Sequence, residues 1–232
     1  MKRVLSWVFF VAYPIVLLMF FASILTTTPY MRLSKGLYST HDDIYYDHMY
    51  VARELIGFIN YRHDDMYFGA DPEDTEPVMT QIAIDHMVDV RDVYTRLRIT
   101  AGIALVVVIG LAILMIKSDI KWFYETLKNS FWLPLGFIAF VGTWFAIDFN
   151  RIFTWFHLLF FDGGWQLPSI PHPLEPGRMI HDPLILLVPE AFWLVSGSLI
   201  IVGVALTYGA TWWINQKVVY PLVIKDTNKE NK

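Results

Sequence analysis

Four apolar runs dominate the 232-residue sequence, and each is long enough to cross a bilayer. A crossing helix needs about 20 predominantly apolar residues. The predicted transmembrane helices are residues 1–25, 99–117, 131–149 and 184–214. Hydrophobic residues make up 55% of the chain and charged residues only 17%, which is typical of a membrane protein. The sequence therefore predicts an all-α polytopic membrane protein with four transmembrane helices.

The segments between these runs complete the predicted layout. Within 26–98, residues 47–61 form an amphipathic pattern, and a helical pattern resumes at 78–98 before the second crossing. The segment 150–183 is rich in glycine and proline after residue 162 and cannot be a long helix. We expect these two segments to form an extracellular cap. The segments 118–130 and 215–232 are predicted to be a cytoplasmic loop and tail.

The distribution of charge predicts the orientation in the membrane. Residues 1–3, 117–130 and 215–232 hold nine Lys and Arg but only four acids, whereas eighteen acids lie in the other polar segments. By the positive-inside rule, both termini are expected to be cytoplasmic, and the polar chemistry lies at the outer leaflet of the cell membrane. The chain shows no basic stripe, which argues against nucleic acid as a partner. With no cysteine, it has no disulfide, thiolate nucleophile or thiolate metal site.

His157 is a titratable residue inside an aromatic and aliphatic stretch, DFNRIFTWFHLLFF, at residues 148–161. An ionisable group at membrane depth is a candidate functional residue. The alternative is an interfacial histidine that is paired with a backbone carbonyl. A catalytic role would require a partner from elsewhere in the chain.

The sequence DHMVDVRDV, residues 85–93, supplies such a partner in His86. Asp89 follows three residues later, so the two side chains share a face of a helix, and a carboxylate there can orient an imidazole and raise its basicity. This pattern suits a general base. The alternative is a charged, solvated helix face.

Other polar residues near the membrane are weaker candidates. Asp148 is expected to pair with Arg151 or a cap residue, and Asp182 to cap the fourth apolar run. Glu190 needs a partner, for which Arg91 and Arg151 are candidates, and Tyr13 needs one for its hydroxyl. The remaining histidines fall in polar segments where exposure is expected: His41, His48, His63, His172 and His181. No short ligand spacing supports a metal site.

Three stretches together resemble the lipoprotein intramolecular transacylases of Gram-positive bacteria. They are HMVDVR, the FxxFHxxFF pattern ending at Phe161, and DPLILLVPEAFW at the start of the fourth run. The resemblance covers the four-helix layout and most of the chain. It implies a membrane acyltransferase whose substrate is the N-terminus of a diacylated lipoprotein. The sn-2 acyl chain of the diacylglyceryl-cysteine would move to the α-amino group of the same cysteine, giving the lyso-form, with no cofactor and no metal.

For that reaction, His86 and His157 are the predicted catalytic residues. His86, oriented by Asp89, is assigned as the base, although the two roles can be exchanged. A protonated His157 or Arg91 could stabilise the oxyanion. Two other classes of protein fit the sequence: a non-enzymatic membrane anchor or sensor with an acidic outer cap, and a metal-dependent membrane hydrolase using the same histidines.

Overall fold

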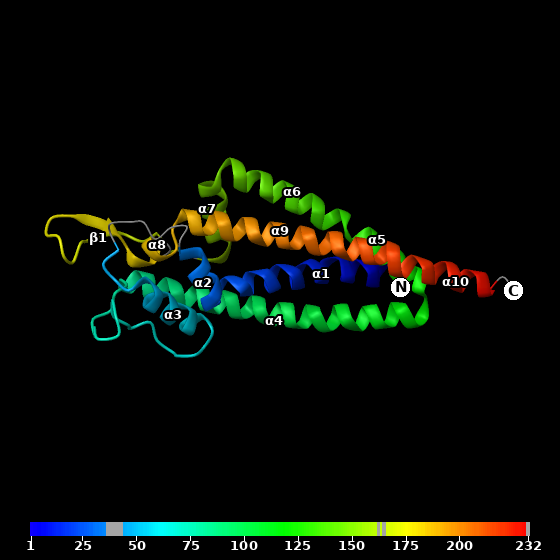
Figure 1. Cartoon of the computed structure of the whole chain (residues 1–232), viewed down its shortest axis with the longest axis horizontal. Helices are drawn as coiled ribbons and strands as arrows, with labels where there is room; N and C mark the ends of the chain where they lie inside the picture. Colours follow the sequence, from blue (N-terminus) through cyan, green and yellow to red (C-terminus); the bar gives the residue numbers. More distant parts are fainter. Residues whose placement is uncertain (36–43, 162, 164–165, 231–232) are drawn as a thin grey trace. The chain divides into compact units, whose positions relative to one another are not determined.

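The computed structural model describes residues 1–35, 44–161, 163 and 166–230. The predicted fold class is confirmed, because the regular secondary structure of the described residues is helical apart from one short hairpin (Figure 1). Within this part of the chain, four stretches are long and apolar enough to cross a membrane: Lys2–Leu25, Gln81–Ser118, Ile120–Ile147 and Glu190–Asn228.

The described elements follow one another along the chain, and the longest described connection between two of them is residues 60–80. They are α1 (Lys2–Leu25), α2 (Thr28–Ser34), α3 (His48–Ile59), α4 (Gln81–Ser118), α5 (Ile120–Ser130), α6 (Trp132–Ile147), α7 (Phe149–Phe160), β1 (Ser169–Pro171), β2 (Met179–His181), α8 (Pro183–Leu187), α9 (Glu190–Ile214), the π-helical turn η2 (Asn215–Val219) and α10 (Tyr220–Glu230).

The chain divides into two compact units. Unit 1 contains Met1–Phe21, Leu97–Ile147 and Ser198–Lys232, and unit 2 contains Ala22–Arg96 and Asp148–Gly197. Unit 2 thus gathers most of the two polar segments that were predicted to form a cap. Unit 1 holds most of the apolar helical sequence.

In unit 1, small residues and aromatic rings allow the helices to pack closely. Leu17 of α1 packs with Val204 and Tyr208 of α9. A Cβ at Gly203 would overlap the ring of Phe21, so glycine at this position permits the close approach of α1 and α9. Without a strong hydrophobic driving force between helices in lipid, such van der Waals contact is a main source of their association.

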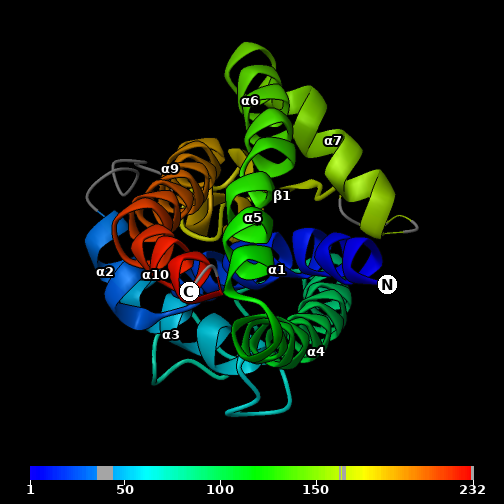
Figure 2. The ribbon, with the colours of Figure 1, turned by 90° about the vertical axis from the view of Figure 1, so that its right-hand side faces the viewer.

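The predicted cytoplasmic loop and tail are both helical in the structure. Asp119 caps α5 by accepting hydrogen bonds from the backbone N–H groups of Lys121 and Trp122, at 3.0 and 3.1 Å. Tyr124 of α5 packs with Val223 of α10, and the two helices lie side by side (Figure 2). The sequence prediction of a loop at 118–130 was therefore wrong, because an amphipathic helix of low mean hydropathy was overlooked there.

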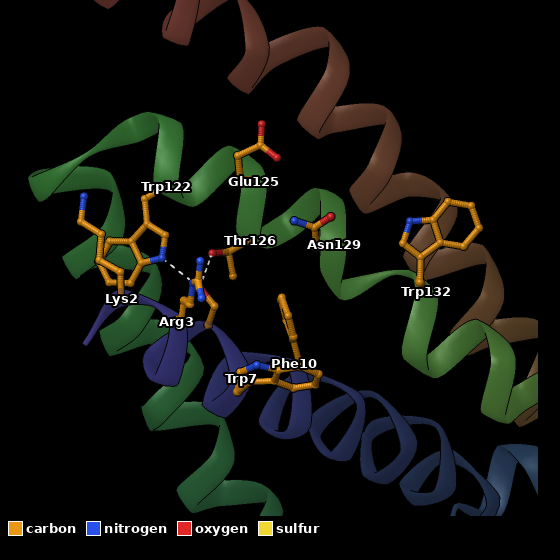
Figure 3. Close-up of a pocket in the computed structure, with 10 residues that line it drawn as sticks. Lys2, Arg3, Trp7, Phe10, Trp122, Glu125, Thr126, Asn129 and Trp132 are labelled. Atoms are coloured by element: carbon orange, nitrogen blue, oxygen red, sulfur yellow. Dashed lines mark hydrogen bonds between the residues drawn. The ribbon is translucent and has the colours of Figure 1, made fainter.

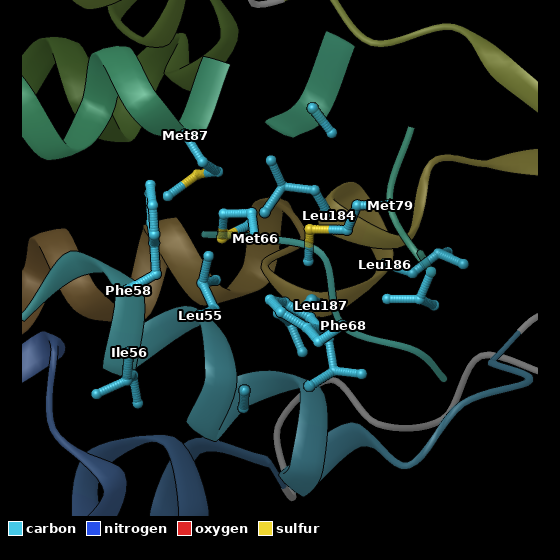
Figure 4. Close-up of a cluster of buried hydrophobic side chains, with 14 of the residues drawn as sticks. Leu55, Ile56, Phe58, Met66, Phe68, Met79, Met87, Leu184, Leu186 and Leu187 are labelled. Atoms are coloured by element: carbon cyan, nitrogen blue, oxygen red, sulfur yellow. The ribbon is translucent and has the colours of Figure 1, made fainter. Parts of the chain in front are cut away.

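Unit 2 has its own hydrophobic core, which α3, α4 and α8 build with the connecting segments. Asp47 caps α3 through the N–H groups of Met49 and Tyr50. Val51, Leu55, Ile56 and Ile59 of α3 are buried, so the apolar face matches the predicted helix at 47–61. Figure 4 shows Leu55 and Phe58 among Met66, Met87, Leu184 and Leu187. Each such buried side chain contributes about 1.5–3 kcal/mol relative to an exposed one.

The proline-rich segment before α8 contains a small antiparallel hairpin. β1 pairs with β2 so that Ile170 lies opposite Ile180. Pro183 occupies the first turn of α8, and Pro189 separates α8 from α9. A proline fits the first turn of a helix because its missing N–H has no intrahelical partner there. The fourth predicted crossing, residues 184–214, is consequently divided near Pro189 into α8 and α9.

Candidate active site

His86 and His157, which are 71 residues apart in the sequence, meet in unit 2. Their ring centroids are 5.8 Å apart and the ring planes are inclined by 29°. His86 is 8% exposed and His157 is 7% exposed. The expected convergence of the two imidazoles is thus present in the structure.

The start of α4 fixes the position of His86. The Thr80 hydroxyl oxygen accepts a hydrogen bond from the N–H of Ala83 at 3.2 Å, and it donates to Asp182 Oδ2 at 2.6 Å. Asp182 also accepts from the N–H of Leu184 at 2.8 Å, which caps α8. One carboxylate therefore ties the first turn of α4 to the first turn of α8. The sequence predicted the cap at Asp182 but missed Thr80, although a threonine before a helical pattern is a recognisable start signal.

Asp182→Ala is expected to destabilise the protein by about 2–4 kcal/mol, since it removes a cap and a hydrogen bond to a fully buried carboxylate. Thermal unfolding in detergent would measure this loss. Asp148→Ala is the matched control, because among the described residues Asp148 accepts the backbone N–H of Arg151 alone, and its replacement should cost about 1 kcal/mol. Equal losses of stability in the two variants would contradict the role of Asp182 in linking α4 to α8.

The position of His157 is set by α7. Asp148 begins this helix by accepting the N–H of Arg151 at 3.0 Å, as expected for a cap residue. Among the described residues of α7, His157 is the buried one, whereas Trp155, Leu158 and Leu159 are exposed. The helix therefore presents one polar ring inward and a broad apolar surface outward.

A hydrogen bond of 2.8 Å joins Nδ1 of His157 to the backbone carbonyl of Phe153. A carbonyl oxygen can only accept, so Nδ1 carries the proton and, in the neutral ring, Nε2 carries the lone pair. Burial lowers the pKa of His157 below its ordinary value, and the hydrogen bond to Phe153 only partly opposes this effect. The ring is therefore neutral at pH 7 and presents Nε2 as a proton acceptor.

Aromatic rings enclose the two imidazoles. The Phe153 ring centroid lies 4.0 Å from that of His157. Phe161 contacts both histidines, at 5.5 Å from His157 and 4.9 Å from His86. Within the described residues, Nδ1 of His86 is buried and has no hydrogen-bond partner. Such a nitrogen can form a hydrogen bond with a bound molecule, or exchange a proton with it, without first breaking a hydrogen bond within the protein.

Asp89 does not orient His86, so this prediction was wrong. Asp89 is exposed on α4, and in the described part of the chain it forms no hydrogen bond with His86. Three residues along a helix correspond to a separation of about 60° around its axis. That angle is enough to place one side chain in the interior and the other in solvent.

The remaining predicted site residues lie away from the imidazole pair or have other partners. The guanidinium of Arg91 lies 3.9 Å from the ring centroid of Phe58 and 4.9 Å from that of Tyr61. Glu190 is exposed at the start of α9 and forms no ion pair with any described residue. Tyr13 belongs to unit 1, where its hydroxyl is 2.7 Å from that of Thr211. Tyr13 and Arg91 therefore have packing or hydrogen-bond partners of their own, although Nε of Arg91 is buried without a hydrogen-bond partner among the described residues.

Two of the other histidines differ in burial from what was expected. His48 and His172 are buried, whereas His181 is exposed. His172 accepts a hydrogen bond from the N–H of Leu174, and its ring packs against Tyr45. His41 lies outside the described residues.

Comparison with known proteins places this arrangement in a family. The family model described as "Lipoprotein intramolecular transacylase Lit" matches residues 4–193. The chain belongs to this family. The Lit family is a family of acyltransferases, so the chain is an enzyme, and the alternative of a non-enzymatic anchor no longer holds.

Solved structures of a Lit protein share the fold. The membrane integral lipoprotein intramolecular transacylase Lit from Bacillus cereus is 18% identical, with a TM-score of 0.69 over 99% of this chain and 98% of that chain. A variant of that protein with one histidine replaced by arginine is 16% identical, with a TM-score of 0.62 over 99% and 95% of the two chains. A variant with alanine instead is 16% identical, with a TM-score of 0.63 over 97% and 96%. No curated protein matches the chain.

Acidification is expected to destabilise the folded protein through the buried ring. Because the folded-state pKa of His157 is lowered, the unfolded chain binds a proton first, near pH 6.5. The stabilisation is therefore fully present above pH 6.5 and is lost as the pH falls below it. Thermal unfolding should show a lower midpoint at pH 5 than at pH 7, with a smaller drop in His157→Gln. An identical drop in both proteins would assign the effect to other groups.

Proposed function

We propose that this Lit-family enzyme transfers the sn-2 acyl chain of a diacylglyceryl-cysteine lipoprotein to the α-amino group of the same cysteine. His86 and His157 would be the catalytic residues. The observation that carries the proposal is the packing of two imidazoles against each other among phenylalanine rings, with the tautomer of one ring fixed. Site and substrate are further supported by the family's description as a lipoprotein intramolecular transacylase.

The reaction needs positioning more than a strong nucleophile. Ester and amine belong to one molecule, so holding the head group in an attack geometry can supply a large effective molarity. The exposed apolar side chains of α7, including Leu158 and Leu159, suit contact with acyl chains. The aromatic rings around the histidines keep the ester away from bulk water, which favours attack by the amine over hydrolysis.

Proton transfer is where the histidines act. The neutral amine attacks the ester carbonyl, and Nε2 of His157 accepts a proton from the nitrogen as the C–N bond forms. The resulting imidazolium then donates that proton to the glycerol oxygen as the C–O bond breaks. No net proton is gained or lost, and the product is an amide with a free sn-2 hydroxyl.

His86 would act as a hydrogen-bond donor to the developing oxyanion. An imidazole N–H is a donor whether the ring is neutral or charged. The stabilisation that such a hydrogen bond gives an oxyanion is larger in a site that excludes water. This assignment reverses the roles expected from the sequence. The reason is that His157 has a fixed acceptor nitrogen, whereas His86 has no carboxylate to raise its basicity.

The test is the structure of the product. Purified enzyme is incubated with a synthetic diacylated lipopeptide in mixed micelles, and the product is fragmented by mass spectrometry. We expect an unchanged total mass, with one acyl group moved from glycerol to the α-amino nitrogen. Release of free fatty acid, or a lipopeptide whose amine remains unmodified, would rule out the transfer. A hydrolase that requires a metal would also lose activity in a chelator.

A further inference from the structure

A second candidate ligand-binding site lies in unit 1, at the start of α1 and along α5. A cavity of about 670 Å³ opens between these helices (Figure 3). Its polar wall is a short chain of hydrogen bonds, in which Trp122 Nε1 donates to Ser6 Oγ at 2.9 Å and Ser6 Oγ lies 2.8 Å from Thr126 Oγ1. The indole N–H and two hydroxyls supply three hydrogens for two bonds. One O–H is therefore available to a ligand, since neither hydroxyl forms a further hydrogen bond with the described residues.

The cavity carries one uncompensated charge of each sign. Lys2 is neutralised by Asp119, at 2.6 Å, and its ammonium group also lies 5.4 Å from the ring of Trp122. Arg3 and Glu125 also line the cavity, and neither has an ion-pair partner among the described residues. A ligand that complements this pair must itself carry both a negative and a positive group.

The rim of the cavity indicates a lipid ligand. Trp7 is 59% exposed and Trp132 is 69% exposed, and both line the opening. Exposed indoles on membrane-crossing helices lie at the level of the lipid headgroups, where the apolar ring and the N–H both find partners. Phe10 extends the apolar wall along α1, which is itself long and apolar enough to cross a membrane.

We propose that this cavity binds a phospholipid whose headgroup holds both a phosphate and an ammonium, as in phosphatidylethanolamine. The guanidinium of Arg3 binds the phosphate through its paired N–H donors, which match phosphate oxygens. The carboxylate of Glu125 binds the ammonium, and the spare O–H of the Ser6–Thr126 pair donates to an ester or phosphate oxygen. The site involves neither His86 nor His157, so the inference does not depend on the proposed acyl transfer.

The test is lipid binding by the full-length, delipidated protein, measured by native mass spectrometry. Phosphatidylethanolamine, phosphatidylglycerol and diacylglycerol with identical acyl chains are compared. We expect phosphatidylethanolamine to bind at least about tenfold more tightly than the other two, since each charge-assisted bond is worth about one decade of affinity. Arg3→Gln should weaken its binding about tenfold, and Arg3→Lys should restore part of the loss. Glu125→Gln should abolish the preference over phosphatidylglycerol.

Lys121→Gln is the matched control, because Lys121 is exposed on α5 and does not line the cavity. It should bind the three lipids like the unmodified protein, and gel filtration should show all variants to be monodisperse. Equal binding of phosphatidylethanolamine and diacylglycerol would overturn the proposal. Displacement of the lipid by millimolar inorganic phosphate would overturn it as well, by showing a simple anion site.

Discussion

Replacing His157 by alanine is expected to lower the rate of acyl transfer by a factor of about 10² to 10⁴, the usual contribution of a positioned acid–base group. The ring is 7% exposed, and its Nδ1–H donates to the carbonyl of Phe153, so Nε2 is the proton acceptor. Without it, the amine must lose its proton to water in a site enclosed by aromatic rings. Initial rates with a diacylated lipopeptide would measure the loss.

His157→Gln separates proton transfer from packing. A glutamine can still donate a hydrogen bond to the carbonyl of Phe153, but it cannot carry the proton from nitrogen to oxygen. We therefore expect a loss as large as that in His157→Ala. His181→Ala is the matched control, because His181 is exposed on β2, and its rate should stay within about twofold of the unmodified enzyme. A glutamine variant that keeps a tenth or more of the activity would show that His157 is not the base.

Replacing His86 is expected to cost a factor of about 10² to 10³, the range seen when an oxyanion donor is removed. Because the rings of His86 and His157 are 5.8 Å apart and are proposed to act on one transition state, their effects should not multiply. The double variant should therefore be no more than a few-fold slower than the slower single variant. His86→Asn, which retains an N–H donor, should lose less activity than His86→Ala. If the fold-loss of rate in the double variant equals the product of the two single losses, the two histidines act in independent steps.

The features that the sequence predicted are those encoded by local patterns. The length of an apolar run sets whether it can cross a bilayer, and this required no knowledge of tertiary contacts. The spacing of Val51, Leu55 and Ile59 likewise identifies the buried face of α3. Asp182 was recognisable as a cap, since a cap acts on N–H groups only two or three residues away.

The features that the sequence could not predict depend on which side of a helix faces the interior. Asp89 lies close enough to His86 along α4 to suggest an interaction, yet it is exposed while His86 is buried. The boundary between interior and solvent is set by α7 and by Phe161, the residue that follows it, which are distant in sequence. The sequence raised a backbone carbonyl as a partner for His157, but it could not identify Phe153 as its source, because every residue carries such an atom.

Short elements were missed for a different reason. The hairpin of β1 and β2 has three residues in each strand, too few for an alternating pattern to be read among prolines. The helix α5 was read as a loop because it is not apolar enough to resemble a crossing. Its start signal was nonetheless present, since Asp119 stands one residue before the helix as a cap.

The hydrogen bond between His157 and the carbonyl of Phe153 makes the orientation of the imidazole depend on a main-chain atom. A carboxylate partner would be lost by a single codon change, but a carbonyl oxygen remains whatever side chain occupies position 153. Substitutions can therefore change the exposed apolar side chains of α7 while the imidazole keeps its direction.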